Sequence, residues 1–369
     1  MPVDKIKVEN AQSNYSIFIG NNILNILPKQ IKICCPKAKK IGIVLDKKIP
    51  KKFKKKICQL LNKYEIFIFE YNSSEKVKSF SHVNELVNRC LKNNFNRSDI
   101  LIAFGGGVLG DFCGFAASIL KRGVNFINLP STLLAQVDSS IGGKTGVNSE
   151  YGKNLIGSFY QPKIVLTDVS LLESLPKREM VCGFAEILKH SLILKNNFFK
   201  FLEKNSQKIL KGKDKNLLKK AIYESCKIKL FYVKKDVNEN NVRMILNYGH
   251  TFAHAIEAKN KFSKKINHGE AVLIGMMMAT KLSEYKKICS SETLLKLVEF
   301  YKNNNLNYNL KSIFKNKNLN AITNFMSNDK KNNDKKISLI LLKKIGLTTK
   351  PGSQKFSEVE LKQLIKKII

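Results

Sequence analysis

The feature that most constrains the fold is a change in sequence periodicity near residue 170. Before it, short runs rich in Ile, Val and Phe alternate with segments of helical spacing, and these runs lie at 41–46, 66–71, 99–104, 124–130 and 163–168. Strands that alternate with helices predict an open, mainly parallel α/β sheet. Beyond residue 170, long lysine-rich amphipathic segments such as 216–235 and 269–287 predict packed helices.

The length of the chain predicts two domains, because 369 residues exceed what one hydrophobic core usually serves. We expect an α/β domain over 1–170 and an all-α domain over 171–369. No stretch approaches ~18 uninterrupted apolar residues, so no transmembrane helix is expected. The first residues lack the apolar run of a signal peptide, and we therefore expect a cytoplasmic protein without a membrane partner.

The charge is strongly positive, since 65 Lys and Arg against 29 acidic residues give +36 at pH 7. Such a charge normally suggests a nucleic-acid partner. Nucleic-acid readers cluster Arg for bidentate contacts, however, whereas here the basic residues are mainly lysines spread over the whole chain. We therefore favour a lysine-rich surface over nucleic-acid binding, and we expect the charge to attract an anionic substrate.

The cysteines are scattered without a CxxC pair or a regular framework. This pattern favours reduced thiols that act as small core residues over disulfides or a zinc-thiolate site. The residues concerned are Cys34, Cys35, Cys58, Cys90, Cys113, Cys182, Cys226 and Cys289.

A glycine-rich turn, FGGGVLGDFCGF, follows the third of these strands and precedes a helical segment. Gly105, Gly107 and Gly110 satisfy GxGxxG, in which glycines let backbone N–H groups approach a pyrophosphate at a helix N-terminus. The acidic residue expected about 20 positions further on is missing, so the pattern indicates a nucleotide site of non-standard arrangement. Asp46, at the end of the first of these runs, is either a ribose contact or a plain strand-end cap.

Three of the five histidines lie close together in the second half of the chain. NYGHTFAHAIEA places His250 and His254 four positions apart on one face of an expected helix, and INHGEAV supplies His268. This cluster indicates a divalent-metal site, with ordinary packed or surface histidines as the alternative. The spacing leaves open whether three histidines, or two histidines and a carboxylate, would bind the metal.

Taken together, several long segments closely resemble the 3-dehydroquinate synthases of the sugar phosphate cyclase family. They are GGGVLGDFCGFAAS, RGVNFINLPSTLLAQVDSSIGGKTGVN, YGKNLIGSFYQP, LPKREMVCGFAEILKH, RMILNYGHTFAHAIEA and HGEAVLIGMMMA. EKVKS at 75–79 resembles a further family motif, although Ser74 replaces its glycine. The resemblance implies a Rossmann-like NAD-binding domain, an all-α metal-binding domain and a homodimer.

Carried over position by position, the resemblance implies that the metal ligands are Glu186, His250 and His268. It implies NAD contacts from Asp46, Glu75, Lys78, Gly106, Gly107, Val108, Asp111, Ser131, Thr132, Asp138, Ser139, Lys144, Lys153 and Ser174. It implies substrate contacts from Arg122, Lys144, Asn154, Lys229, Arg243, Asn247 and Lys330, with Arg122 reaching the site of the partner subunit. It gives catalytic roles to Asp138, Lys144, Lys189 and His254.

The reaction implied is the conversion of 3-deoxy-D-arabino-heptulosonate 7-phosphate into 3-dehydroquinate and phosphate, in the shikimate pathway. Its stages are transient oxidation by NAD, phosphate elimination, re-reduction, ring opening and intramolecular aldol closure. Zn²⁺, for which Co²⁺ can substitute, would act as a Lewis acid. The substrate is a small sugar-acid phosphate, and lysine and arginine side chains suit both its carboxylate and its phosphate.

Three other functions remain open at this point. One is a related cyclase acting on sedoheptulose 7-phosphate or glucose 6-phosphate, which lack the carboxylate that Lys229 and Arg243 would bind. Another is a metal-dependent alcohol dehydrogenase, which would release NADH stoichiometrically. The last is a nucleic-acid-binding protein, which charge alone supports.

Overall fold

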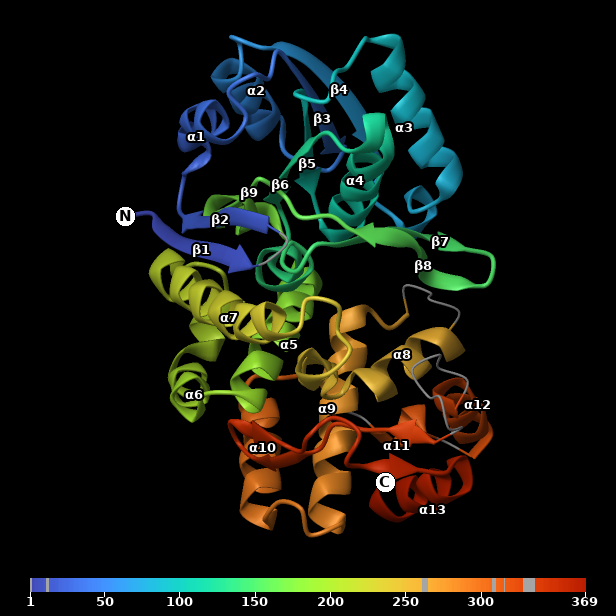
Figure 1. Cartoon of the computed structure of the whole chain (residues 1–369). Helices are drawn as coiled ribbons and strands as arrows, with labels where there is room; N and C mark the ends of the chain where they lie inside the picture. The colour runs from blue at the N-terminus through green and yellow to red at the C-terminus, as the bar shows by residue number, and fades with distance from the viewer. Residues whose placement is uncertain (1, 11–12, 261–264, 307–309, 315, 328–335) are drawn as a thin grey trace. The chain divides into compact units, whose positions relative to one another are not determined.

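The computed structural model describes residues 2–10, 13–260, 265–306, 310–314, 316–327 and 336–369 (Figure 1). The chain divides into two compact units. The first comprises residues 1–180 and 212–230, and the second comprises residues 181–211 and 231–369.

The first unit contains a seven-stranded sheet, parallel except for its first strand. Its order is β1 (Asp4–Asn10), β2 (Ser13–Gly20), β9 (Ile164–Asp168), β6 (Asn125–Pro130), β5 (Ile100–Gly105), β3 (Lys40–Asp46) and β4 (Glu65–Tyr71). The five runs predicted as strands are confirmed as β3, β4, β5, β6 and β9. Not predicted were β1, β2 and the separate hairpin of β7 (Lys144–Ser149) and β8 (Gly152–Phe159).

Helices cover both faces of this sheet, because alternate side chains of its central strands point to opposite sides. Ile41, Ile43 and Leu45 of β3 pack with α1 (Leu27–Cys34) and α2 (Lys51–Leu60). Val44 of the same strand packs with α3 (Phe80–Lys92) and α4 (Gly107–Ile119). Short helical turns complete the unit: η1 (Leu24–Ile26), η2 (Glu75–Val77), η3 (Leu120–Arg122), the π-helix η4 (Ala135–Ser139) and η5 (Val169–Ser174).

The strand order explains the unusual position of the glycine turn. From β3 the chain moves outward to β4 and then returns to β5 on the other side of β3. Ligands of open α/β sheets bind beyond the carboxyl ends of the strands where the order reverses in this way. The loops after β3 and β5 meet this condition, so the glycine turn lies at the switch point although it follows the third predicted strand.

The second unit is helical, as expected, apart from two small two-stranded sheets. Its helices are α5 (Lys177–Ile193) from Val181 on, α6 (Asn196–Leu210), the end of α7 (Lys215–Lys235), η6 (Val242–Asn247), α8 (His250–Lys259), α9 (His268–Tyr285), α10 (Ser291–Asn303), α11 (Leu310–Ile313), α12 (Asn316–Ser327) and α13 (Glu358–Ile368). The sheets pair β10 (Ile337–Ser338) with β13 (Lys355–Phe356), and β11 (Leu342–Lys344) with β12 (Leu347–Thr348). Helix α9 is buried almost all round and forms the centre of this unit.

All eight cysteines are free thiols, and six of them are buried, as predicted for reduced core residues. Cys34 and Cys58 are partly exposed. Among the residues that the structure describes, no helix is both long and apolar enough to cross a membrane.

Candidate active site

The glycine turn forms the N-terminus of α4 at the carboxyl end of β5. Gly106 is the N-cap, and Gly107 and Val108 begin the helix, so their N–H groups lie at its positive end. A Cβ atom at Gly107 would lie 2.5 Å from Ser139 Oγ. A side chain at this position would therefore crowd Ser139, because the π-helix η4 passes directly beside the turn.

Asp46 lies next to this turn, at the end of β3. It is 8% exposed, and its Oδ1 accepts a hydrogen bond from the Lys48 N–H at 3.0 Å. A Cβ atom at Gly105 would lie 3.3 Å from the Asp46 Cβ. Asp46 is thus a strand-end cap that also borders the glycine turn, which leaves the ribose contact a prediction.

Two polar clusters connect α4, η2 and the β7–β8 hairpin. The buried Lys78 Nζ lies 2.6 Å from Asp111 Oδ2 and 2.5 Å from Asn154 Oδ1. Burial raises the pKa of Asp111, and the Lys78 charge offsets part of this shift. Lys153 Nζ pairs with Glu75 Oε1 at 3.4 Å. Most of the long charged side chains predicted to contact NAD are therefore already held by neighbours.

The π-helix η4 carries Asp138 and Ser139. Lys229 Nζ donates to both Asp138 Oδ1, at 2.7 Å, and the Asp138 carbonyl, at 2.6 Å. Gln136, in the same π-helix, is fully buried, and its Nε2 donates to the carbonyls of Pro130 and Asp168 at 3.1 and 3.0 Å. π-Helical turns are rare and occur mostly at functional sites, and here one is anchored at both ends.

The remaining predicted residues of the first unit are spread around the same loops. The Ser131 N–H donates to the Gly105 carbonyl at 2.8 Å, and Thr132 Oγ1 accepts from the Ala135 N–H at 3.2 Å. The other predicted residues of this unit are exposed: Arg122, Lys144, Asn154 and Ser174. Arg122 has a left-handed backbone conformation with φ of 63°.

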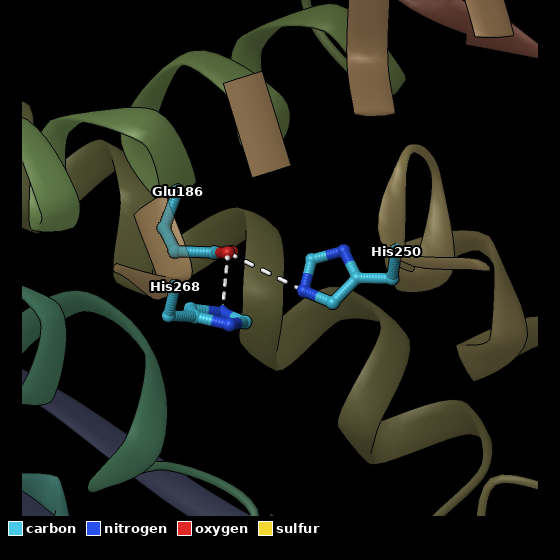
Figure 2. Close-up of side chains that lie close together, drawn as sticks. All are labelled: Glu186, His250 and His268. Atoms are coloured by element: carbon cyan, nitrogen blue, oxygen red, sulfur yellow. Dashed lines mark ion pairs between the residues drawn. The ribbon is translucent and has the colours of Figure 1, made fainter. Parts of the chain in front are cut away.

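Three helices of the second unit bring Glu186, His250 and His268 together. Figure 2 shows Glu186 of α5 pointing toward the rings of His250 and His268, which are the first residues of α8 and α9. Glu186 Oε1 lies 3.4 Å from His250 Nε2 and 3.5 Å from His268 Nε2. One ligand atom from each residue lies within 4.8 Å of the others, which suits a shared metal ion.

The charged groups of this cluster shift the pKa values of one another. Burial acts to raise the pKa of Glu186, but Lys189 and both histidines hold it well below its usual range. Burial and the Lys189 charge lower the pKa of His250. Burial also acts to lower the pKa of His268, but the neighbouring carboxylates of Glu186 and Glu257 raise it to about 10. A metal ion would therefore displace a proton from His268 when it binds.

The residues fit a metal ion in two further respects. Both carboxylate oxygens of Glu186 are buried and accept no hydrogen bond within the described part of the chain, although cations lie at ion-pair distance. The Nδ1 atoms of the histidines have other acceptors, namely the Tyr248 carbonyl at 3.3 Å and Glu257 Oε2 at 3.2 Å. These contacts leave the two Nε2 atoms to face Glu186.

The other predicted residues of this unit lie on α5, η6 and α8. Lys189, 2% exposed, forms an ion pair with Glu186 one turn earlier. His254 is exposed, with its ring centre 5.4 Å from that of His250.

Two predicted substrate contacts lie on η6. Arg243, like Lys189, is only 2% exposed, and its NH1 donates to the Val237 carbonyl at 2.5 Å. Asn247 Nδ2 donates to Glu239 Oε1 at 2.9 Å, and Lys330 lies outside the described residues.

Sequence reasoning missed three residues that hold these groups in place. Glu257 contacts His268, Gln136 anchors η4, and Asp236 accepts hydrogen bonds from the backbone N–H groups of Asn240, Asn241 and Arg243. Of these three, only Glu257 could have been found from the sequence. It follows His250 by seven positions, about two helical turns, and so shares a helix face with it.

Solved structures of both synthases and alcohol dehydrogenases share this fold. A 2-deoxy-scyllo-inosose synthase matches with a TM-score of 0.87 and 25% identity, covering 99% of this chain and all of that one. The 2-epi-5-epi-valiolone synthase of Streptomyces hygroscopicus subsp. jinggangensis 5008 matches with a TM-score of 0.83 and 21% identity, covering 98% of each chain. An iron-containing alcohol dehydrogenase of Thermococcus thioreducens matches with a TM-score of 0.71 and 14% identity, covering 96% of this chain and 98% of that one.

Sequence comparison narrows this fold class to one family. The family described as 3-dehydroquinate synthase N-terminal matches residues 68–182, and the one described as 3-dehydroquinate synthase C-terminal matches residues 183–332. The 3-dehydroquinate synthase of Pelagibacter ubique (strain HTCC1062) is 51% identical over 347 residues, 94% of each chain. That of Thermodesulfovibrio yellowstonii is 40% identical, covering 93% of this chain and 95% of the relative. The chain belongs to the 3-dehydroquinate synthase family, which confirms the resemblance seen in its motifs.

Proposed function

We propose that this chain is a 3-dehydroquinate synthase, a carbon–oxygen lyase that converts 3-deoxy-D-arabino-heptulosonate 7-phosphate into 3-dehydroquinate and phosphate. The observation that carries this proposal is the convergence of Glu186, His250 and His268 in a member of this family. The high identity to a 3-dehydroquinate synthase over nearly the whole chain favours this substrate over those of related synthases.

NAD is the proposed cofactor of the first unit. The related 2-deoxy-scyllo-inosose and 2-epi-5-epi-valiolone synthases were solved with NAD⁺ bound. Asp46, the Gly106–Gly107 turn and Ser139 would hold it at the carboxyl edge of the sheet. When bound, NAD would supply a reversible hydride acceptor and would be regenerated in each turnover.

The same two relatives carry Co²⁺ or Zn²⁺, and we propose a divalent cation of this kind for this chain. Glu186, His250 and His268 would hold it, with an open position for substrate oxygens. When bound, it would supply Lewis acidity that favours ionisation of a substrate hydroxyl.

The side chains around these two sites have distinct proposed roles. Lys229 and Arg243 would bind the substrate carboxylate, since both are buried cations with fixed partners. Lys189 would neutralise the buried Glu186 and polarise a substrate hydroxyl. His254, which is exposed, would exchange the proton of that hydroxyl with solvent. Lys144 and Asn154 would contact the phosphate end of the substrate.

Three further expectations are part of the proposal. The chain would act as a cytoplasmic homodimer, and the exposed Arg122 would reach the substrate of the partner subunit. Residues 1–170 would form the NAD-binding domain, and residues 171–369 would form the metal-binding domain. Lys330 would add a further substrate contact.

The test is phosphate release from 3-deoxy-D-arabino-heptulosonate 7-phosphate with NAD present, before and after treatment with EDTA. We expect release that EDTA abolishes and Zn²⁺ or Co²⁺ restores, without net formation of NADH. Glu186→Ala should lose this activity, whereas Glu292→Ala, at an exposed position on α10, should keep it. Release from sedoheptulose 7-phosphate alone would overturn the substrate, and stoichiometric NADH would indicate an alcohol dehydrogenase.

A further inference from the structure

We propose that Glu257 is a positioning residue that orients the His268 ring for metal binding. Helix α8 would then provide one ligand, His250, and also the side chain that holds another ligand, His268. This inference rests on the metal site of the proposed function, and it extends that site to a residue that does not itself touch the metal.

The contacts of His268 place Glu257 and Glu186 on opposite sides of one ring. Glu257 Oε2 lies 3.2 Å from His268 Nδ1, while Glu186 Oε1 lies 3.5 Å from His268 Nε2. A carboxylate that accepts the Nδ1 proton fixes the tautomer and leaves the Nε2 lone pair for a metal ion. Glu257 is only 14% exposed, so water screens this contact weakly.

The backbone of His268 is already fixed by other groups. His268 lies inside a capping box, in which Asn267 Oδ1 accepts from the Glu270 N–H and Glu270 Oε2 accepts from the Asn267 N–H, both at 2.9 Å. The remaining freedom is therefore the rotation of the ring about its side-chain bonds. Glu257 acts on this freedom, and its loss should change ring orientation more than it changes the helix.

The two histidines differ in what supports them. His250 Nδ1 faces the carbonyl of Tyr248, which no side-chain substitution removes. His268 Nδ1 instead faces a side chain, that of Glu257. Both histidines stand in the first turn of a helix, where the helix dipole disfavours positive charge on the ring. The negative charge of Glu257 offsets this effect and makes His268 the more electron-rich donor.

The experiment measures zinc affinity by competition with a chromogenic chelator, which needs no substrate. Glu257→Ala should weaken zinc binding by about 10- to 100-fold, the usual effect of removing such a partner. Glu257→Gln, which keeps an acceptor but not the charge, should recover part of the loss. Glu292→Ala serves as the matched control and should bind zinc like the unmodified protein. In the Co²⁺-loaded protein, Glu257→Ala should also change the visible spectrum.

Zinc affinity of Glu257→Ala and Glu257→Gln within twofold of the unmodified protein would overturn the inference. If Glu257→Ala fails to fold, Glu257→Gln alone decides, because it is nearly the same size and shape. Zinc binding that His268→Ala leaves unchanged would overturn both the metal site and this inference. Zinc binding that depends on His268 and Glu257 in a protein without cyclase activity would overturn only the proposed function.

Discussion

The backbone N–H of Gly269 donates a hydrogen bond to Cys182 Sγ at 3.2 Å. Cys182 lies one turn before Glu186 on α5, and Gly269 directly follows His268 on α9. A Cβ atom at Gly269 would collide with the α5 backbone at Cys182. The two helices therefore touch beside the residues that bring Glu186 and His268 together, and this contact requires a glycine.

Gly269→Ala should push α9 away from α5 and separate the two proposed ligands. We expect zinc affinity to fall at least tenfold and the free energy of unfolding to fall by about 1–3 kcal/mol, as for other overpacked sites. Chelator competition and urea unfolding measure these effects. A second change, Cys182→Ala, should not restore either value, because the colliding atoms belong to the backbone. Restoration would show that the Cys182 side chain, and not the helix spacing, is responsible.

Gly107→Ala should weaken NAD binding. The new methyl group would meet Ser139 Oγ at 2.5 Å and displace either the glycine turn or η4. A steric cost of about 1–3 kcal/mol corresponds to roughly a 5- to 150-fold loss of affinity, measurable by calorimetry. Ser139→Ala removes the nearest atom but also a proposed NAD contact, so the double variant is compared with Ser139→Ala alone. In that background Gly107→Ala should cost less NAD affinity than in the unmodified protein. An equal cost in both backgrounds would contradict this explanation.

Lys229→Met should loosen η4, because it removes the ammonium group that binds both the side chain and the carbonyl of Asp138. We expect the free energy of unfolding to fall by about 1–3 kcal/mol, together with a large loss of kcat/KM. The matched control is Lys227→Met, since Lys227 is 41% exposed and its contacts with Glu224 and the Tyr223 ring lie on the helix surface. This control should change stability by less than about 0.5 kcal/mol. Equal losses of unfolding free energy in the two variants would contradict the idea that Lys229 holds η4 in place.

The contribution of Asp236 to stability should depend on pH. Desolvation acts to raise the pKa of Asp236, but hydrogen bonds from the backbone of Asn240, Asn241 and Arg243 outweigh it and lower the pKa. A lowered pKa in the folded state stabilises the protein above the ordinary value of 3.8, and this stabilisation is lost as the pH falls further. The stability difference between the unmodified protein and Asp236→Ala should thus be present at pH 7 and shrink near pH 3.

Urea unfolding at both pH values measures this difference. Asp236→Ala should also raise the KM for the substrate, because the same carboxylate fixes the loop that carries Arg243. A stability difference that is the same at pH 7 and pH 3 would contradict the assignment of the lowered pKa to these hydrogen bonds.

Of the five strands that the sequence predicts, the edge strand β4 is partly exposed, and the other four are buried at nearly every position. Strands β5 and β9 are buried at every position and therefore read as continuous apolar runs. Strand β1 alternates Lys with apolar residues at the sheet edge, and β8 is largely exposed. Neither β1 nor β8 forms an apolar run, which explains why these two strands were not predicted. β2 does contain the short buried run 17–19, so this reason does not apply to it. β1 pairs with β2, and β7 with β8, as hairpins of adjacent strands, and β2 also pairs with the distant strand β9.

The metal cluster shows a second limit of local patterns. The spacing of His250 and His254 suggests two ligands on one helix face, but only the family motifs pointed to Glu186 instead. Glu186 lies far away in the sequence, and the packing of α5 against the helices of the histidines brings it close. The role of Glu257 depends on the direction of one imidazole ring, which no sequence pattern specifies.

The seven-residue spacing of His250 and Glu257 on α8 limits how this segment can change in length. Seven residues make almost two full turns, so both side chains lie on one face of the helix. A single inserted or deleted residue between them would rotate Glu257 by about 100° around the helix axis relative to His250. Substitutions on the opposite face leave the relation intact. Evolutionary drift in this segment should therefore proceed through exchanges of side chains and never through insertions or deletions.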